Sequence, residues 1–406
     1  MTLFYGWIIV AAGFVISCAG FGTLMALGVF LQPMSTALGW SRASISAAAT
    51  LSFLAMGAGS FLWGALSDRF GTRAVLLAGG TILGLGLIAA SQATTPLQFQ
   101  LLFGVLTGLG AGSFYAPLMA VTTRWFTRHR SLAVALVSAG MSLGSTTVAP
   151  LARWLISTQD WRTALLLLGL LAWAVILPAA LLVREVSGDV ARAAAASEPP
   201  NGMTVAQALR TPQFAAIALT HFACCAAHSG PIFHMVSYAI DCGVPAMAAA
   251  TVIGTAGLAS LCGRIGCGLI ADQVGAKQTL IVGLLVQATA VSLYLLAGGL
   301  TSFYLLAALF GLAYGGVMPL YAILAREYFG ARIMGTVFGA VAMTSTVGMA
   351  LGPLAGGWLF DTWGSYFWLY TGSAGIGLGA VAIAFLFRPA GTPEIMRPGS
   401  ALPRAA

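Results

Sequence analysis

The chain has 406 residues, of which 59% are hydrophobic and only 7% are charged. A typical soluble domain carries about 25% charged residues, so this composition excludes a soluble protein. The formal net charge of +8 comes from basic residues scattered singly along the chain, a pattern that gives no nucleic-acid-binding patch. The composition therefore predicts a helical membrane protein with no nucleic-acid partner.

Twelve apolar segments follow one another along the chain, each long enough to cross a bilayer core of about 30 Å as a helix. A polar stretch separates the sixth segment from the seventh. The sequence predicts an all-α membrane protein with two pseudo-symmetric six-helix bundles at 1–184 and 211–388, a cytoplasmic linker at 185–210 and a cytoplasmic tail at 389–406. The expected segments are approximately 6–33, 43–66, 74–93, 97–123, 132–157, 163–184, 212–240, 246–270, 278–299, 303–325, 333–360 and 366–387.

The positions of the basic residues predict the orientation of the chain. Loops on the cytoplasmic side of a membrane are enriched in Lys and Arg. With both termini in the cytoplasm, most of the 18 basic residues fall on that side, and only Arg42, Arg153 and Arg162 fall at the outer ends of segments. We therefore expect a multi-pass protein of the plasma (inner) membrane with both termini in the cytoplasm.

A short charged turn follows the second segment and recurs after the eighth. The first copy, at 64–73, contains Asp68, Arg69 and Arg73, and a weaker copy at 268–277 contains Asp272. This turn resembles the signature of the major facilitator superfamily. The resemblance implies two bundles that rock around a central site, with these four residues as gating candidates. The alternative is a solvated turn whose charges only set the topology.

A second match, at 124–144, runs from directly after the fourth segment into the fifth. Together with Tyr5-Gly6-Trp7, Gly39-Trp40-Ser41-Arg42 and the stretch 233–243, it resembles the monocarboxylate porter family, which includes oxalate:formate antiporters. The resemblance spans essentially the whole chain. It implies alternating-access transport of carboxylate anions, a monomeric protein and no cofactor.

Arg264 is the charged residue that lies deepest in a predicted segment. It precedes Asp272 by eight residues, about 12 Å along a helix. An unpaired guanidinium inside a membrane costs several kcal/mol, so either a protein anion or a bound anion should pair with it. The family resemblance implies that Arg264 binds the substrate carboxylate. Ser260 stands where animal members often carry an aspartate, and snorkelling to the membrane edge is the alternative.

Aromatic and histidine side chains supply further candidates. Tyr115 and Tyr314 follow glycines in equivalent segments and match family positions that line the cavity, and Leu24 is a candidate for apolar substrate contact. A phenol can donate a hydrogen bond to a carboxylate. His221 and His228 share one helix face and could carry a proton. For each of these residues the alternative is ordinary packing between helices.

The leading hypothesis is a transporter of small organic monocarboxylates, such as lactate or pyruvate. All ten acidic residues fall in loops, at segment ends or in the tail, so proton coupling through a buried carboxylate is not expected. Three routes stay open: a proton carried by His221 or His228, a proton carried by the substrate itself, and proton-free anion exchange. A multidrug or other solute exporter and a non-transporting sensor are the alternatives. With no nucleotide loop, metal cluster or nucleophile arrangement, we expect neither an enzyme nor a metal site.

Overall fold

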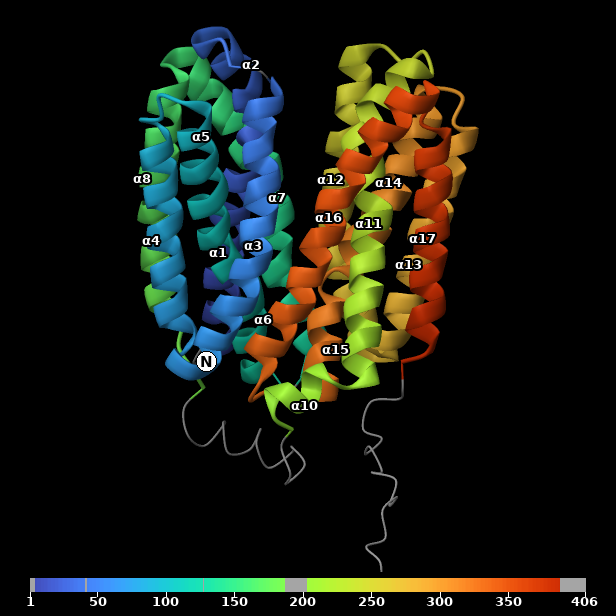
Figure 1. Cartoon of the computed structure of the whole chain (residues 1–406). Coiled ribbons are helices and arrows are strands. Elements are labelled where there is room, and N and C mark those ends of the chain that lie inside the picture. Colours follow the sequence, from blue (N-terminus) through green and yellow to red (C-terminus); the bar gives the residue numbers. More distant parts are fainter. Residues whose placement is uncertain (1–3, 41, 127, 187–202, 388–406) are drawn as a thin grey trace, which may run out of the picture.

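The computed structural model describes residues 4–40, 42–126, 128–186 and 203–387. These residues form helices and no strand. Twelve helical spans within them are long and apolar enough to cross a membrane. Figure 1 shows two side-by-side groups of upright helices, one from each half of the chain. The predicted fold class, an all-helical protein with twelve membrane spans, is therefore confirmed.

We call the two groups the N half and the C half. The N half contains α1 (Tyr5–Met25), α2 (Leu27–Leu38), α3 (Arg42–Phe70), α4 (Thr72–Ala90), α5 (Pro96–Phe99), the π-helical η1 (Gln100–Thr107), α6 (Gly108–Trp125), α7 (Arg130–Thr158) and α8 (Trp161–Leu182). The C half contains α11 (Pro212–Asp241), α12 (Ala246–Val274), α13 (Ala276–Leu293), the 3-10 helix η2 (Tyr294–Leu296), α14 (Leu300–Val317), α15 (Leu320–Phe329), α16 (Met334–Trp363) and α17 (Phe367–Phe385).

Between the halves, a short helix α10 (Val205–Leu209) precedes α11. It begins at Thr204, whose side chain accepts a hydrogen bond from the backbone of Gln207. Most of the predicted linker, at 187–202, and the predicted tail at 389–406 lie outside the described residues.

The tenth span is not the continuous helix that the apolar run at 303–325 predicts. It divides into α14 and α15 at Met318 and Pro319. Proline has no N–H to donate to the preceding turn and clashes with the carbonyl four residues back, which explains the interruption. The first span divides at Ala26 and continues as α2 to Leu38, beyond the predicted end.

The glycines of the repeated turn have a conformational role. Gly71 lies between α3 and α4 with φ of 85°, and Gly275 lies between α12 and α13 with φ of 96°. Glycine adopts such angles at little cost because it lacks a Cβ atom. The two copies of the motif therefore make the same tight turn at the same end of both halves.

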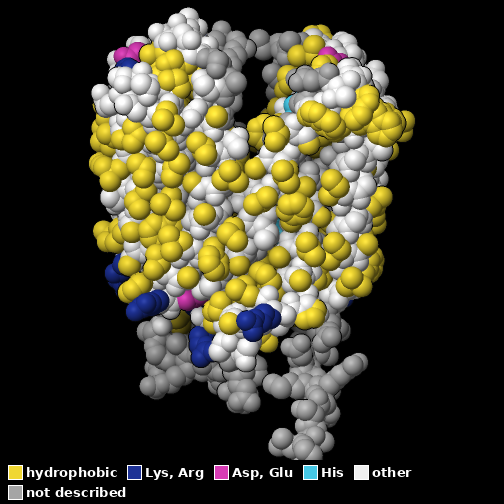
Figure 2. Space-filling model, in the orientation of Figure 1, with side chains coloured by type: hydrophobic (Ala, Val, Ile, Leu, Met, Phe, Trp, Pro, Cys, Tyr) yellow, Lys and Arg dark blue, Asp and Glu magenta, His cyan; other side chains and the backbone are white. Residues whose placement is uncertain are grey.

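The two ends of the molecule differ. Figure 1 places the described start of the chain and the end of α17 at one end, which we call the terminal end. On the face in Figure 2, hydrophobic side chains cover the middle, and most visible Lys and Arg side chains lie near the terminal end. The halves meet near this end, and a gap separates them at the opposite end, which we call the far end.

Two helix pairs make the most extensive contacts between the halves, α3 with α16 and α7 with α12. Both pairs contain glycines that permit close approach of the backbones. A Cβ atom added at Gly64 of α3 would lie 2.1 Å from the Gly335 carbonyl oxygen of α16. One added at Gly268 of α12 would lie 2.6 Å from the Cβ atom of Ala135 on α7. These contacts bring side chains from opposite halves within hydrogen-bonding distance.

Candidate functional site

Arg264 lies on α12 and is only 4% exposed. Its Nε donates a hydrogen bond of 2.9 Å to the Ser142 hydroxyl. Its Nη1 is buried without a hydrogen-bond partner among the described residues. Within the same residues, both recorded ion pairs involve Arg124, and neither involves Arg264. Arg264 therefore brings a buried positive charge that no described carboxylate neutralises.

Ser142 comes from α7, in the opposite half from Arg264. The hydroxyls of Ser142 and Ser260 are 3.3 Å apart, so Ser260 lies in the same buried polar group. The sequence did not single out Ser142, because it is one of several serines in the same apolar segment. Its position opposite Arg264, across the interface between α7 and α12, becomes visible only in three dimensions.

Tyr314 and His228 lie beside Arg264 on the C-half side. Tyr314 is close enough to Arg264 for a side-chain interaction, and the rings of His228 and Tyr314 are 4.7 Å apart. Nδ1 of His228 bonds to the Cys224 carbonyl oxygen at 2.8 Å, which leaves Nε2 buried without a partner among the described residues. The guanidinium, the phenol and the imidazole thus form one cluster.

Close helix packing explains this cluster. A Cβ atom at Gly263, next to Arg264, would lie 2.0 Å from the Leu312 carbonyl oxygen. One at Gly315, next to Tyr314, would lie 2.3 Å from the carbonyl oxygen of Ser260. Glycine at both positions lets α12 and α14 touch backbone to backbone, which brings Arg264 and Tyr314 together.

Tyr115 belongs to the N half and reaches across the interface. Its hydroxyl donates a hydrogen bond of 3.1 Å to the Met318 carbonyl oxygen, at the break between α14 and α15. Its ring packs against Phe338 of α16, with centroids 5.3 Å apart. The phenol proton expected to face a carboxylate is therefore used between the halves in this conformation.

The other two candidates lie in packed surroundings. His221 stacks on Tyr321 with ring centroids 4.0 Å apart, and its Nδ1 is buried without a partner among the described residues. Leu24 of α1 is 3% exposed and belongs to the hydrophobic core. A contact between Leu24 and a substrate remains a prediction.

Asp68 joins the halves at the terminal end. Its carboxylate accepts hydrogen bonds from the Thr336 backbone at 2.7 Å, from the Thr336 hydroxyl at 2.8 Å and from the Gly335 backbone at 3.2 Å. These groups lie at the start of α16, where unpaired N–H groups and the helix dipole favour an anion. Asp68 also forms a 2.8 Å ion pair with Arg124, whose guanidinium donates to the Ala331 carbonyl oxygen.

Asp272 makes the equivalent contact from the C half to the N half. Its two oxygens accept hydrogen bonds from the backbone of Ser131 at 2.9 Å and of Leu132 at 3.1 Å, at the start of α7. We call the Asp68 and Asp272 contacts the two latches. The other gating candidates stay within the N half, because Arg73 donates to the Val183 carbonyl oxygen at 2.8 Å and Arg69 lies over the Phe70 ring.

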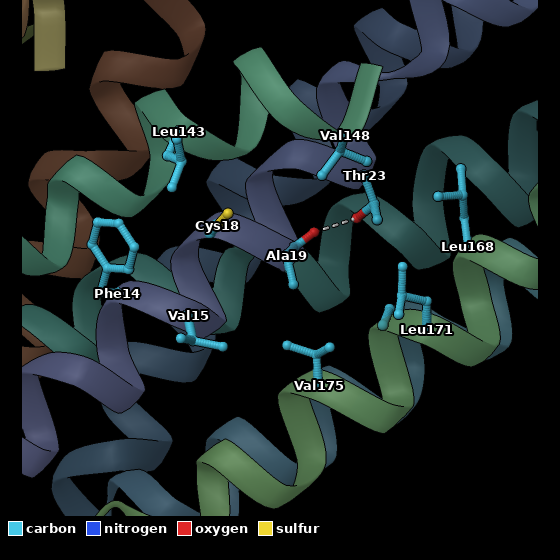
Figure 3. Close-up of a pocket in the computed structure, with 11 residues that line it drawn as sticks. Phe14, Val15, Cys18, Ala19, Thr23, Leu143, Val148, Leu168, Leu171 and Val175 are labelled. Carbon is cyan, nitrogen blue, oxygen red and sulfur yellow. Dashed lines mark hydrogen bonds between the residues drawn. The ribbon is translucent and has the colours of Figure 1, made fainter. Parts of the chain in front are cut away.

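A separate cavity of about 330 Å³ lies between α1, α7 and α8. Figure 3 shows apolar side chains such as Val15, Leu143 and Leu171 pointing into it. Its one hydroxyl, on Thr23, donates to the Ala19 carbonyl oxygen at 3.0 Å. The cavity offers no cationic side chain, so it does not suit a carboxylate. No group of three metal-ligating side chains occurs within the described part of the chain.

Comparison with known proteins gives a consistent result. A model of the Major Facilitator Superfamily matches residues 11–353 and 268–404. The chain is 30% identical to monocarboxylate transporter 13 of Bos taurus, over 89% of this chain and 84% of that protein. It is also 30% identical to monocarboxylate transporter 11 of Mus musculus, over 89% and 83%.

Solved structures share the fold at lower sequence identity. The E. coli fucose:proton symporter FucP is 16% identical, with a TM-score of 0.73 over 95% of this chain and 98% of that one. A FucP structure in the outward conformation gives a TM-score of 0.70 at 16% identity, over 93% and 98%.

Proposed function

This chain belongs to the major facilitator superfamily and is a relative of the monocarboxylate transporters, and we propose that it carries small organic monocarboxylate anions across the membrane by alternating access. The family resemblance seen in the sequence is thereby confirmed. The observation that supports the substrate class is the buried guanidinium of Arg264, with Nη1 unpartnered among the described residues.

Electrostatics favours an anion with one negative charge. A buried charge without a partner is destabilising by several kcal/mol, so an anion beside Arg264 relieves that energy. A carboxylate has two oxygens in one plane and matches the two-nitrogen edge of a guanidinium. A second carboxylate would find no cation among the side chains described around Arg264. Lactate-like and pyruvate-like acids fit this requirement.

The latches support a mechanism in which the halves rock. Asp68 and Asp272 hold the terminal end closed, and the far end is open on the face in Figure 2. With both termini in the cytoplasm, as the basic residues predict, this conformation faces outward. Breaking both latches would open the terminal end and release the anion into the cytoplasm. We propose the plasma (inner) membrane as its location.

His228 is the stronger candidate for proton coupling, because it lies close to Arg264. A positive charge on both side chains is unfavourable while the site is empty. An anion beside them would remove this repulsion, so proton and anion would bind together more readily than either alone. Exchange of one anion for another without a proton is the alternative, and His228 then serves only as a packing and hydrogen-bonding residue.

Transport assays with purified protein in proteoliposomes test the proposal. Vesicles loaded with unlabelled lactate should accumulate labelled lactate or pyruvate by exchange, and lactamide, the neutral analogue, should not compete. Arg264→Lys provides the control, since lysine keeps the positive charge but lacks the planar guanidinium that donates two parallel hydrogen bonds to a carboxylate. Exchange of neutral or cationic solutes with no response to any monocarboxylate would overturn the proposal.

A further inference from the structure

The hydrogen bond between Arg264 and Ser142 joins the anion site to the contact between the halves. Arg264 is 4% exposed and Ser142 is 7% exposed, so solvent does not compete for this bond. One partner lies on α12 of the C half and the other on α7 of the N half. The residue proposed to hold the substrate is thus itself held by the opposite half.

Ser142 differs from the neighbouring serines of α7. The hydroxyls of Ser138 and Ser145 donate to carbonyl oxygens of their own helix, those of Ala135 and Ser142. The hydroxyl of Ser142 instead accepts from Arg264 and lies 3.3 Å from Ser260. Both of these contacts run to α12, so the Ser142 side chain is available to orient the arginine.

Orientation matters because an arginine side chain is long and has many rotamers. Fixing such a side chain when a ligand binds opposes binding, and a side chain that is already fixed avoids this cost. With Nε on Ser142, the opposite edge of the guanidinium, which includes the unpartnered Nη1, stays available for a carboxylate. Ser142 thereby prepares Arg264 for the anion.

The same bond depends on the conformation of the protein. The Asp272 latch joins the same two helices, α12 and α7, and is made at the terminal end. If opening that end also moves α7 away from α12 at the level of Ser142, the 2.9 Å contact is lost, because a hydrogen bond does not survive a separation of several ångströms. Arg264 would then face the cytoplasmic side without its hydrogen bond to Ser142.

We propose that Ser142 is a positioning residue that makes the anion site asymmetric across the membrane, orienting Arg264 for an anion only while the terminal end is closed. This inference rests on the proposed function. It assigns to the N half a hydroxyl that touches the arginine and not the substrate. It predicts that the two faces of the protein bind the same anion with different strength.

The test compares lactate exchange from the two faces, using right-side-out and inside-out vesicles with saturating lactate on the opposite side. In Ser142→Ala, the KM at the outer face should rise about fivefold, the usual effect of having to order one long side chain. The KM at the cytoplasmic face should stay within about twofold of the unmodified protein. Ser142→Thr keeps the hydroxyl and should restore the outer KM.

Ser138→Ala is the matched control, since it removes a buried hydroxyl one turn away on the same helix, and it should change neither KM. Ser142→Cys, which has similar shape and a weak acceptor, repeats the test if the alanine variant does not fold. Equal changes at both faces, or no change at either, would overturn the inference while leaving the proposed function intact. Absence of exchange in the unmodified protein would overturn both.

Discussion

The two helix pairs with the most extensive contacts between the halves, α3 with α16 and α7 with α12, can be compared position by position. The offset that aligns Asp68 with Asp272 also aligns Ser60 with Arg264 and Thr346 with Ser142. At the terminal end the pairs are alike, because each aspartate accepts hydrogen bonds at the start of the partner helix in the opposite half.

At membrane depth the pairs differ. The Ser60 hydroxyl donates to the Met56 carbonyl oxygen of its own helix at 2.8 Å, and the Thr346 hydroxyl donates to Met343 in the same way. Small residues bring this pair together, since a Cβ atom at Gly57 would lie 2.2 Å from Oγ1 of Thr346. The α7–α12 pair instead holds Arg264 and Ser142.

The comparison separates gating from recognition. The aspartate contact proposed to act in gating is present in both pairs, whereas a positive charge at membrane depth is present only in the α7–α12 pair. Under the proposed function, a single anion would therefore bind against the C half, and the uncharged α3–α16 pair would not contact its charge. Substitutions in the two pairs should therefore affect anion binding and exchange rate differently.

Arg264→Gln removes the charge that distinguishes the two pairs. We expect kcat/KM for monocarboxylate exchange to fall by at least about 100-fold, since charge-assisted hydrogen bonds and a buried charge pair are lost together. The variant should remain folded, as judged by its thermal melting, because the arginine is not part of a described ion pair. Exchange within about tenfold of the unmodified protein would show that recognition does not depend on this pair.

His228→Gln tests whether the cluster around Arg264 also binds the transported proton. Glutamine keeps hydrogen bonding but cannot become charged. We expect uptake driven by an inward proton gradient to disappear, while anion exchange without a gradient continues. Undiminished gradient-driven uptake in the His221→Gln/His228→Gln double variant would rule out both histidines as the proton carriers.

Asp68→Asn and Asp272→Asn compare the two latches directly. We expect Asp68→Asn to slow exchange about tenfold and Asp272→Asn to slow it about threefold. The reason is that Asp68 has an ion pair in addition to its backbone contacts, and hydrogen bonds between charged groups are stronger than neutral ones. Equilibrium binding of the anion should be nearly unchanged in both variants. A loss of affinity at an unchanged exchange rate would contradict the gating role.

Tyr314→Phe should weaken anion binding by about 1 kcal/mol, the usual net value of one hydrogen bond. Tyr115→Phe removes a bond between the halves, so its effect should appear more in the exchange rate than in affinity. Titration calorimetry and exchange kinetics on the two variants separate these outcomes. Normal binding and normal rates in both would make the phenols packing residues only.

Ser60→Ala is the smallest change and sharpens the comparison. It removes a hydroxyl at the position equivalent to Arg264, but that hydroxyl bonds its own helix. We expect anion affinity within about twofold of the unmodified protein. A larger loss, measured in the same calorimetric assay, would mean that the α3–α16 pair also takes part in recognition.

The fold was largely predictable from sequence because its signals are local. Twelve apolar runs, the repeated turn around Asp68 and Asp272, and one isolated deep charge at Arg264 can each be seen without a structure. The break in the tenth span was missed, although Pro319 supplied the signal. An apolar run continues through the proline, and hydropathy alone does not register the missing N–H.

The arrangement of the site was only partly predictable. Arg264, Tyr314 and His228 were identified individually, and the structure brings them together through glycine-mediated packing of α12 on α14. Ser142 and the bond from Tyr115 to Met318 were not predicted, because both join segments from opposite halves in one conformation. No periodicity or motif in the chain encodes such a contact.

Calorimetric titration of the purified protein with lactate and with lactamide tests the central claim most directly. If Arg264 is the anion-binding group, lactate should bind the unmodified protein, lactamide should not, and lactate affinity should fall at least about tenfold in folded Arg264→Lys, which keeps the charge but loses the planar guanidinium. Lactate affinity within about twofold of the unmodified protein in Arg264→Lys, or equal binding of lactate and lactamide, would contradict the account.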